Sequence, residues 1–82
     1  MSAGMLEPLA RILRGEREKA GVLQLEVAAR AGVSRPVITR FERHQIIPEI
    51  GLDVLVRAYA IECNVKWLEL WEAALAEARK AK

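Results

Sequence analysis

The sequence has few of the residues that interrupt helices, cross-link a chain or anchor it in a membrane. Its 82 residues include three prolines, five glycines and one cysteine. So little proline and glycine predicts a mostly helical chain. No apolar run approaches the roughly 20 residues of a membrane span, and no signal peptide is indicated at the start of the chain. The lone Cys63 cannot form an internal disulfide, so we expect a cytoplasmic protein.

Residues that carry catalysis or hold metals are also sparse. His44 is the only histidine, and neither it nor Cys63 has a partner at metal-ligand spacing, so we expect no metal site. No nucleophile lies beside a base in the sequence, and no glycine-rich phosphate loop is present. We therefore expect a protein that is not an enzyme, with no cofactor and no small-molecule ligand.

The net charge is only +2, but it is unevenly distributed. Residues 11–44 carry eight Arg or Lys and four Glu, a net charge of +4. Residues 45–82 carry five basic and six acidic residues, a net charge of −1, and Glu7 supplies the remaining −1. Because local positive charge attracts polyanions, we expect any contact with nucleic acid to lie in the first half of the chain.

The chain is long enough for one domain, and we predict a single all-α domain over residues 1–82. Apolar residues recur at helical spacing, interrupted by glycine, proline and capping residues. Asn64 is predicted to cap the N-terminus of the last helix. The five predicted helices cover residues 7–20, 24–31, 35–44, 51–60 and 65–80.

Residues 24–43 are the most informative segment, because their spacing predicts two short helices joined by a sharp turn. Ala28 is small enough to let another helix approach closely. Gly32 follows where the chain must leave the first helix in a left-handed conformation. Ser34 can cap the second helix, and Pro36 falls in its first turn, where a missing N–H costs little.

The second of these helices has one apolar and one basic face. Val37, Ile38 and Phe41 form the inward stripe, and Val33 plugs the turn into the core. Such a pair of helices is how a small domain places side chains in the major groove of DNA. The alternative is an ordinary helical hairpin with a solvated basic face. The residues left facing outward are Arg35, Pro36, Thr39, Arg40 and Arg43.

Residues 11–71 resemble the lambda-repressor and Cro type of helix-turn-helix domain, with actinobacterial and phage members the most similar. The resemblance implies a five-helix DNA-binding domain with residues 35–43 as the recognition helix in the major groove of double-stranded DNA. It rests on residues that stand in the register of that family: Gln24, Val27, Ala28, Ala31, Gly32, Val33, Ser34, Ile38, Phe41, Glu42 and Pro48.

The resemblance also assigns roles to individual residues. A helix 1 arginine, here Arg17, pairs with the glutamate that ends the recognition helix, Glu42, as a structural brace. The residues that match base-facing positions are Arg35, Pro36, Thr39 and Arg40. The resemblance also implies that Gln24 and Arg43 contact the DNA backbone, and such contacts position a protein without specifying sequence. Arg30 and Arg14 are two further residues that we expect to contact the backbone.

The sequence departs from the family pattern in three places. Leu23 replaces the usual threonine, so the second helix is expected to lose its side-chain cap. His44 replaces the usual glycine after the recognition helix, where a left-handed residue is needed. Residues 45–47, Gln-Ile-Ile, replace a loop that is usually basic, which removes phosphate contacts.

The predicted last helix, residues 65–80, is more apolar than a peripheral helix requires. This favours a homodimer interface formed by one of its faces, although the same face could pack onto the helices at residues 7–20 and 51–60. The candidate interface residues are Trp67, Leu70, Trp71 and Ala74.

The expected function is therefore sequence-specific regulation of transcription, as a homodimeric repressor on a pseudo-palindromic operator and with localisation to the nucleoid through DNA. Phage repressors, restriction–modification controllers and antitoxins share this scaffold, and the sequence does not separate them. The alternative from another class is a protein-interaction module in which DNA binding is weak or secondary. The low net charge, residues 45–47 and the two tryptophans favour that alternative.

Overall fold

The computed structural model describes residues 2–80, which form five helices and, within that range, no strand. This confirms the predicted all-α, five-helix fold. The described range leaves residues 1, 81 and 82 of the predicted domain outside it. The helices are α1 (Ser2–Ala20), α2 (Gln24–Ala31), α3 (Arg35–Glu42), α4 (Leu52–Cys63) and α5 (Trp67–Lys80).

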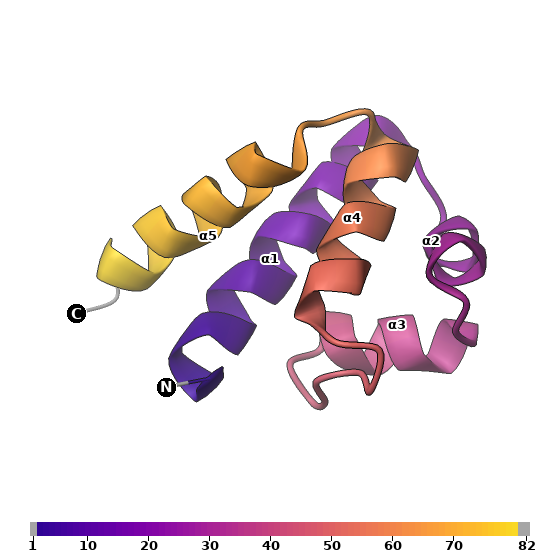
Figure 1. Ribbon diagram of the computed structural model, residues 1–82, viewed down its shortest axis with the longest axis horizontal. Helices are drawn as coiled ribbons and strands as arrows, with labels where there is room; N and C mark the ends of the chain where they lie inside the picture. Colours follow the sequence, from indigo (N-terminus) through magenta and orange to yellow (C-terminus); the bar gives the residue numbers. More distant parts are fainter. Residues whose placement is uncertain (1, 81–82) are drawn as a thin grey trace.

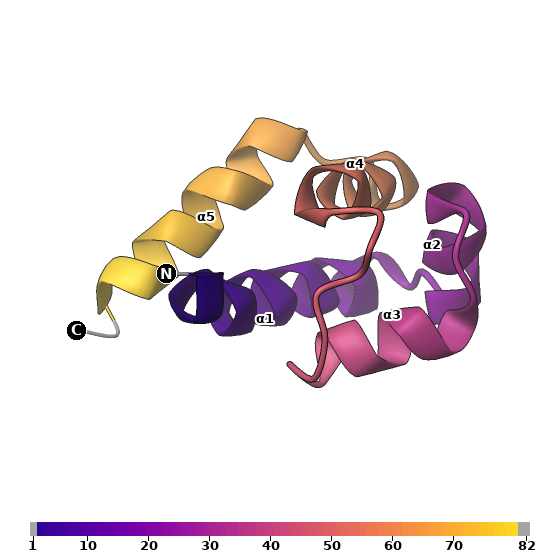
Figure 2. The ribbon, with the colours of Figure 1, turned by 60° about the horizontal axis from the view of Figure 1, so that its bottom comes forward.

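Helix α1 lies at the centre of the molecule, with α3, α4 and α5 packed against it (Figure 1). Helix α5 runs back along α1 in the opposite direction, which places the start of α1 and the end of α5 at the same end of the molecule. Helices α2 and α3 lie at the other end (Figures 1 and 2), where Phe41 of α3 contacts Tyr59 of α4. The surface of α3 that faces away from α1 is therefore open to a ligand.

Every helix contributes to a single core, because each buries one apolar stripe against its neighbours. Phe41 of α3 and Tyr59 of α4 form an aromatic pair in its middle, with ring centroids 6.2 Å apart. Burying a leucine, isoleucine or phenylalanine side chain stabilises a fold by about 1.5–3 kcal/mol. The largest fully buried side chains are Tyr59, Phe41, Leu9, Leu13, Ile38, Leu55, Val27 and Val56.

Several predicted helix boundaries are wrong by two to five residues. Helix α1 begins at Ser2 rather than at residue 7, and α3 ends at Glu42 rather than at residue 44. Asn64 is the C-cap of α4, not the N-cap of α5. It adopts the left-handed conformation, with φ 57°, which asparagine tolerates better than most residues. Helix α4 therefore continues to Cys63, and α5 starts only at Trp67.

The sequence predicts a dimer interface on one face of α5, with Trp67, Leu70, Trp71 and Ala74 as candidates, but two of these four residues are not accessible to a partner. Leu70 and Ala74 are buried in the core of the single chain, because the apolar stripe to which they belong packs on α1. Trp67 and Trp71 are half-buried and pack against the same core. The large apolar residues that α5 leaves exposed are Leu68 and Leu75.

Within the described residues, no helix is both long and apolar enough to cross a lipid bilayer.

Candidate nucleic-acid interface

The segment that carries α3 is fixed by the turn between α2 and α3. Gly32 is the C-cap of α2, with φ 76° and ψ 30° in the left-handed region, where a side chain costs about 1–2 kcal/mol. The amide of Val33 donates to the carbonyl of Ala28 at 3.0 Å and closes the turn. Ile38 and Phe41 are fully buried. These contacts determine which face of α3 points away from the core.

The start of α3 differs from the expectation for Ser34. This residue occupies the N-cap position with extended dihedrals, but its side chain makes no capping hydrogen bond. Pro36 has no N–H to donate in the first turn. The first turn is closed by a backbone hydrogen bond, in which the Val37 amide donates to the Ser34 carbonyl at 3.1 Å. The predicted side-chain cap is therefore wrong, although the boundary of the helix is right.

At the other end of α3, His44 adopts φ 63°, as the pattern of the sequence requires. The backbone there closes the helix without a glycine: the His44 amide donates to the Phe41 carbonyl, and the Gln45 amide to the Arg40 carbonyl, both at 2.9 Å. The chain then turns into the loop that leads to α4.

The outer face of α3 carries the four side chains that were predicted to reach bases. Arg35, Pro36 and Arg40 are exposed, and Thr39 is partly buried. Glu42, the only acidic residue of the helix, points inward and is 3% exposed. The face that α3 presents to solvent therefore carries only positive charge.

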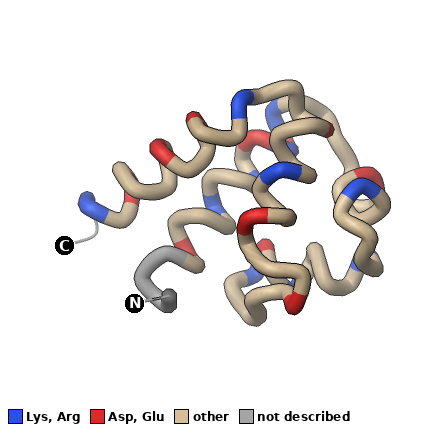
Figure 3. The backbone as a smooth tube through the Cα atoms, in the orientation of Figure 1, with Lys and Arg blue, Asp and Glu red and all other residues tan. Residues whose placement is uncertain are grey.

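The arginines of α3 and its C-terminal end differ from the other arginines of residues 11–57 in that they form no ion pair with a described residue. Within the described residues, Arg35, Arg40 and Arg43 form no ion pair with a carboxylate, whereas every other arginine between residues 11 and 57 does. Figure 3 shows acidic positions recurring along α5, at the far side of α1 from α3. The charge of the three unpaired guanidinium groups is thus available to an external anion.

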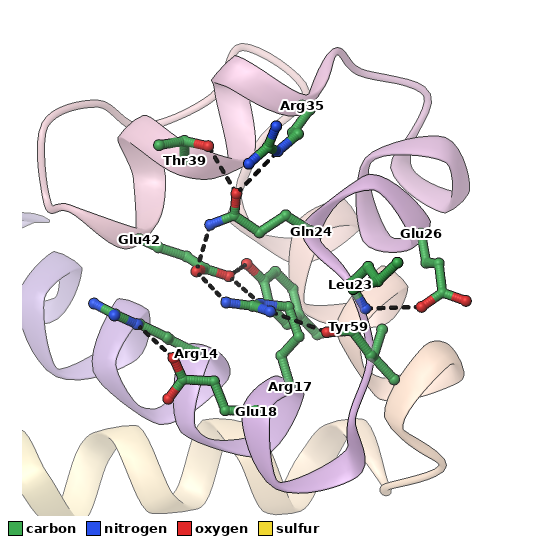
Figure 4. A network of polar contacts seen from close by, with 11 residues as sticks. Arg14, Arg17, Glu18, Leu23, Gln24, Glu26, Arg35, Thr39, Glu42 and Tyr59 are labelled. Carbon is green, nitrogen blue, oxygen red and sulfur yellow. Dashed lines mark hydrogen bonds and ion pairs between the residues drawn. The ribbon is translucent and has the colours of Figure 1, made fainter.

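Gln24, the first residue of α2, connects this face to the interior (Figure 4). Its Oε1 accepts hydrogen bonds from the Thr39 hydroxyl at 2.8 Å and from Arg35 Nε at 3.4 Å. Its Nε2 donates to Glu42 Oε1 at 3.0 Å. One side chain therefore holds two residues of the outer face and the buried carboxylate in fixed relation.

Glu42 and Arg17 form the pair that the family pattern implied. Arg17 donates from Nε to Glu42 Oε2 at 2.8 Å and from Nη2 to Oε1 at 2.9 Å, and its Nη1 donates to the Val22 carbonyl at 2.9 Å. Burial raises the pKa of Glu42, but the hydrogen bonds from Arg17, Tyr59 and Gln24 outweigh it, so the pKa lies below its usual value. The hydrogen bond to Glu42 raises the pKa of Arg17. Both groups are charged at neutral pH.

Most of the predicted contact residues gather around one hollow on the surface. It lies between α1, α2 and α3, and its polar lining includes Arg14, Gln24, Arg35, Thr39 and Arg43. Pro36 and Arg40 line a second hollow along α3, which shares Arg35, Thr39 and Arg43 with the first. All but one of the predicted DNA-contacting residues therefore lie on one continuous surface.

Arg30 is the exception. Its Nε donates to Glu62 Oε2 of α4 at 2.7 Å. Together with Glu26, Ala29 and Glu62, it lines a different hollow from the one between α1, α2 and α3. The structure does not bring it together with the other candidates.

A family model described as helix-turn-helix matches residues 9–57, more than half of the chain. This chain belongs to the helix-turn-helix family. The lambda-repressor-like resemblance expected from the sequence is thereby confirmed. No curated protein matches the chain.

As a helix-turn-helix protein, the chain is a DNA-binding regulator in its broad class. The match spans both helices of the motif, the turn between them, and the first half of α4. Helix α5 and the second half of α4 lie outside it.

Two features of the helix-turn-helix site were not anticipated. Tyr59, assigned only to the core, donates a hydrogen bond to Glu42 Oε2 at 2.5 Å. A buried tyrosine hydroxyl normally requires a partner, and that rule could have identified the contact. At Leu23, where a side-chain cap is missing, the Glu26 carboxylate accepts the Leu23 amide at 2.7 Å. This supplies half of a capping box.

Proposed function

We propose that this protein is a sequence-specific regulator of transcription that inserts α3 into the major groove of double-stranded DNA. The observation that carries the proposal is a set of three unpaired arginines: Arg35 and Arg40 on the outer face of α3, and Arg43 directly after the helix. Such a face suits the major groove of DNA, because guanidinium groups bind both phosphate and the edge of guanine.

Within this proposal the outer residues divide into two groups. Arg35 and Arg40 donate to base edges, where a pair of hydrogen bonds to guanine contributes about 1–3 kcal/mol of discrimination. Thr39 and Pro36 contact bases beside them. Arg14, Gln24 and Arg43, at the rim of the hollow between α1 and α3, contact the DNA backbone.

For the assembly we propose a homodimer, because one recognition helix reads only half of a pseudo-palindromic site, and half-sites in such operators lie about 34 Å apart. The side chains of α5 that support it are Leu68 and Leu75, which are 56% and 44% exposed. They are seven residues apart, so they lie on one face of the helix. Trp67 and Trp71 border that face.

For the regulatory role we propose repression in the cytoplasm, because occupation of an operator is the action that a DNA-binding face performs by itself. A reporter gene placed under the control of an operator found by selection from random DNA tests this proposal. Expression that rises when the protein is supplied would identify an activator instead.

The proposal is tested by selecting bound duplexes from a random DNA pool and then measuring the affinity for the enriched sequence at increasing salt concentration. We expect enrichment of a pseudo-palindrome, and affinity that falls with salt with a log–log slope of about −0.9 per phosphate contact. A pool with no enriched sequence, or binding that is indifferent to salt, would favour a protein-interaction module. Sedimentation that shows only monomer at tens of micromolar, with and without operator, would refute the homodimer.

A further inference from the structure

The hydroxyl of Tyr59 reaches from α4 to the inner end of the recognition helix. Tyr59 is fully buried, and its hydroxyl donates to Glu42 Oε2. Burial, together with the hydrogen bond to Glu42, raises the pKa of this tyrosine far above its usual value, so the proton stays on the hydroxyl. Tyr59 lies beyond residues 9–57, so the family match does not extend to it.

Each oxygen of the Glu42 carboxylate has two donors. Oε2 accepts from Arg17 Nε and from the Tyr59 hydroxyl. Oε1 accepts from Arg17 Nη2 and from Gln24 Nε2. The carboxylate is therefore held in one orientation, and loss of the donor from Tyr59 leaves Oε2 with a single partner.

The orientation of Glu42 is passed outward through Gln24. With its Nε2 held on Glu42 Oε1, the amide of Gln24 presents Oε1 to the outer face, where Thr39 and Arg35 donate to it. A rotation of the carboxylate moves the acceptor of Gln24 Nε2, and Gln24 can then no longer hold both outer side chains in the same place. Figure 4 shows this chain of contacts from Tyr59 to Thr39 and Arg35.

We propose that Tyr59 is a positioning residue for DNA recognition, which acts through Glu42 and Gln24 to preset Arg35 and Thr39 for reading bases. Tyr59 itself touches no DNA, because it is enclosed in the core. This inference rests on the proposed function of α3. A side chain outside the matched motif then determines how well the motif discriminates between sequences.

A purely structural role for Tyr59 makes a different prediction. In that case removal of the hydroxyl would lower stability and leave the ratio of specific to non-specific DNA binding unchanged. Phenylalanine retains the ring and its contact with Phe41, whose centroid is 6.2 Å away. The substitution Tyr59→Phe therefore removes the hydrogen bond with little change in packing.

The experiment compares the wild-type protein, Tyr59→Phe and Val56→Ala, all in the full chain and at a temperature at which each is folded. Val56 lies on the same helix and is fully buried, but it takes no part in the hydrogen bonds around Glu42. It serves as the control for loss of stability. Two quantities are measured: NMR signals of the Glu42 carboxyl carbon and the Gln24 amide group across a pH titration, and affinity for the selected duplex and for an unrelated duplex.

For Tyr59→Phe we expect a higher pKa for Glu42, shifted Gln24 amide signals, and roughly two- to thirtyfold weaker binding to the selected duplex, the range seen for residues that couple to a site without touching its ligand. Binding to the unrelated duplex should be unchanged. Val56→Ala should leave all of these at the wild-type values. The inference is overturned if Tyr59→Phe keeps wild-type Gln24 signals, or if its loss of specific binding equals that of Val56→Ala.

A wild-type protein that binds no duplex would refute the proposed function and, with it, the role in recognition. The NMR measurement needs no DNA, so it still decides whether Tyr59 positions Gln24. Failure of the positioning step and failure of the DNA-binding proposal are therefore distinguishable.

Discussion

Arg17 and Glu42 form a two-pronged ion pair that joins the first helix to the recognition helix, through N–O contacts of 2.8 and 2.9 Å. The side chains are 12% and 2% exposed. Removing one member of a buried pair leaves the other charge without its partner, which is strongly destabilising. The pair therefore affects stability as well as the placement of α3.

We expect Glu42→Gln to lower the free energy of unfolding by about 3–5 kcal/mol, because the guanidinium of Arg17 would remain largely buried without a counter-charge. Urea denaturation followed by circular dichroism measures this loss. Glu18→Gln is the matched control. It breaks an exposed pair with Arg14, for which less than about 0.5 kcal/mol is expected. Similar losses in the two variants would contradict the importance of burial.

Glu42 also predicts how stability depends on pH. Its pKa in the folded state lies below the usual value, so the unfolded chain takes up the proton first as pH falls. The stabilisation is complete above the ordinary glutamate pKa of about 4.3 and is lost as pH falls through the lowered pKa. We expect the difference in unfolding free energy between the wild type and Glu42→Gln to narrow in that range. A difference that stays constant down to about pH 2.5 would show that Glu42 is not the titrating group.

Two glycines give predictions of opposite sign. Gly15 lies inside α1, and a Cβ built there meets nothing within 4 Å. Gly15→Ala should therefore stabilise the protein by about 0.5–1 kcal/mol. Gly32 has equal space but φ of +76°, so Gly32→Ala should destabilise it by about 1–2 kcal/mol. Thermal unfolding of both variants distinguishes backbone conformation from crowding. Changes of the same sign would contradict the argument.

Helix α5 allows its two faces to be tested separately. Leu70 is 2% exposed, so Leu70→Ala should lower the free energy of unfolding by about 2–5 kcal/mol through the cavity that it leaves. Leu68 is 56% exposed, and Leu68→Ala should change the free energy of unfolding by less than about 0.5 kcal/mol. Both are measured by urea denaturation at low protein concentration, where a dimer contributes little. A large loss in Leu68→Ala under those conditions would mean that this face is covered within one chain.

Substitutions at Arg35 and Arg30 compare an arginine proposed to contact bases with an arginine paired inside the protein. Arg35→Ala should weaken binding to the selected duplex by about 1–3 kcal/mol and binding to an unrelated duplex far less. Arg30→Ala should change neither much, because Arg30 pairs with Glu62 away from α3. Fluorescence anisotropy with both duplexes measures these affinities. Equal losses on the two duplexes for Arg35→Ala would refute base reading at that position.

The sequence predicted the motif well because its residues act locally. Gly32 has the left-handed conformation that its position in the pattern requires, and Val27, Ile38 and Phe41 are buried. Each of these properties follows from spacing and backbone sterics within about fifteen residues. The number and order of the helices follow from the same information.

What the sequence could not predict depends on contacts between distant residues. The face of α5 that packs on α1 could not be chosen from periodicity, because the helix carries two apolar stripes, and only packing shows that Leu70 and Ala74 are internal. The pairing of Arg30 with Glu62 joins residues 32 positions apart. The contact between Tyr59 and Glu42 likewise requires α4 to cross the end of α3.

The shortness of the recognition helix has a consequence for how its information is stored. Helix α3 has eight residues, whereas isolated helices shorter than about 12–15 residues are marginal in water. A peptide of α3 together with the following Arg43 would keep all three unpaired arginines and would still attract DNA, but it would not hold them in a fixed arrangement. In this protein, non-specific affinity for DNA depends on the arginines of one segment, whereas discrimination between sequences depends on the fold of the whole chain. When the protein is gradually unfolded with denaturant, specific binding should therefore be lost at a lower denaturant concentration than non-specific binding.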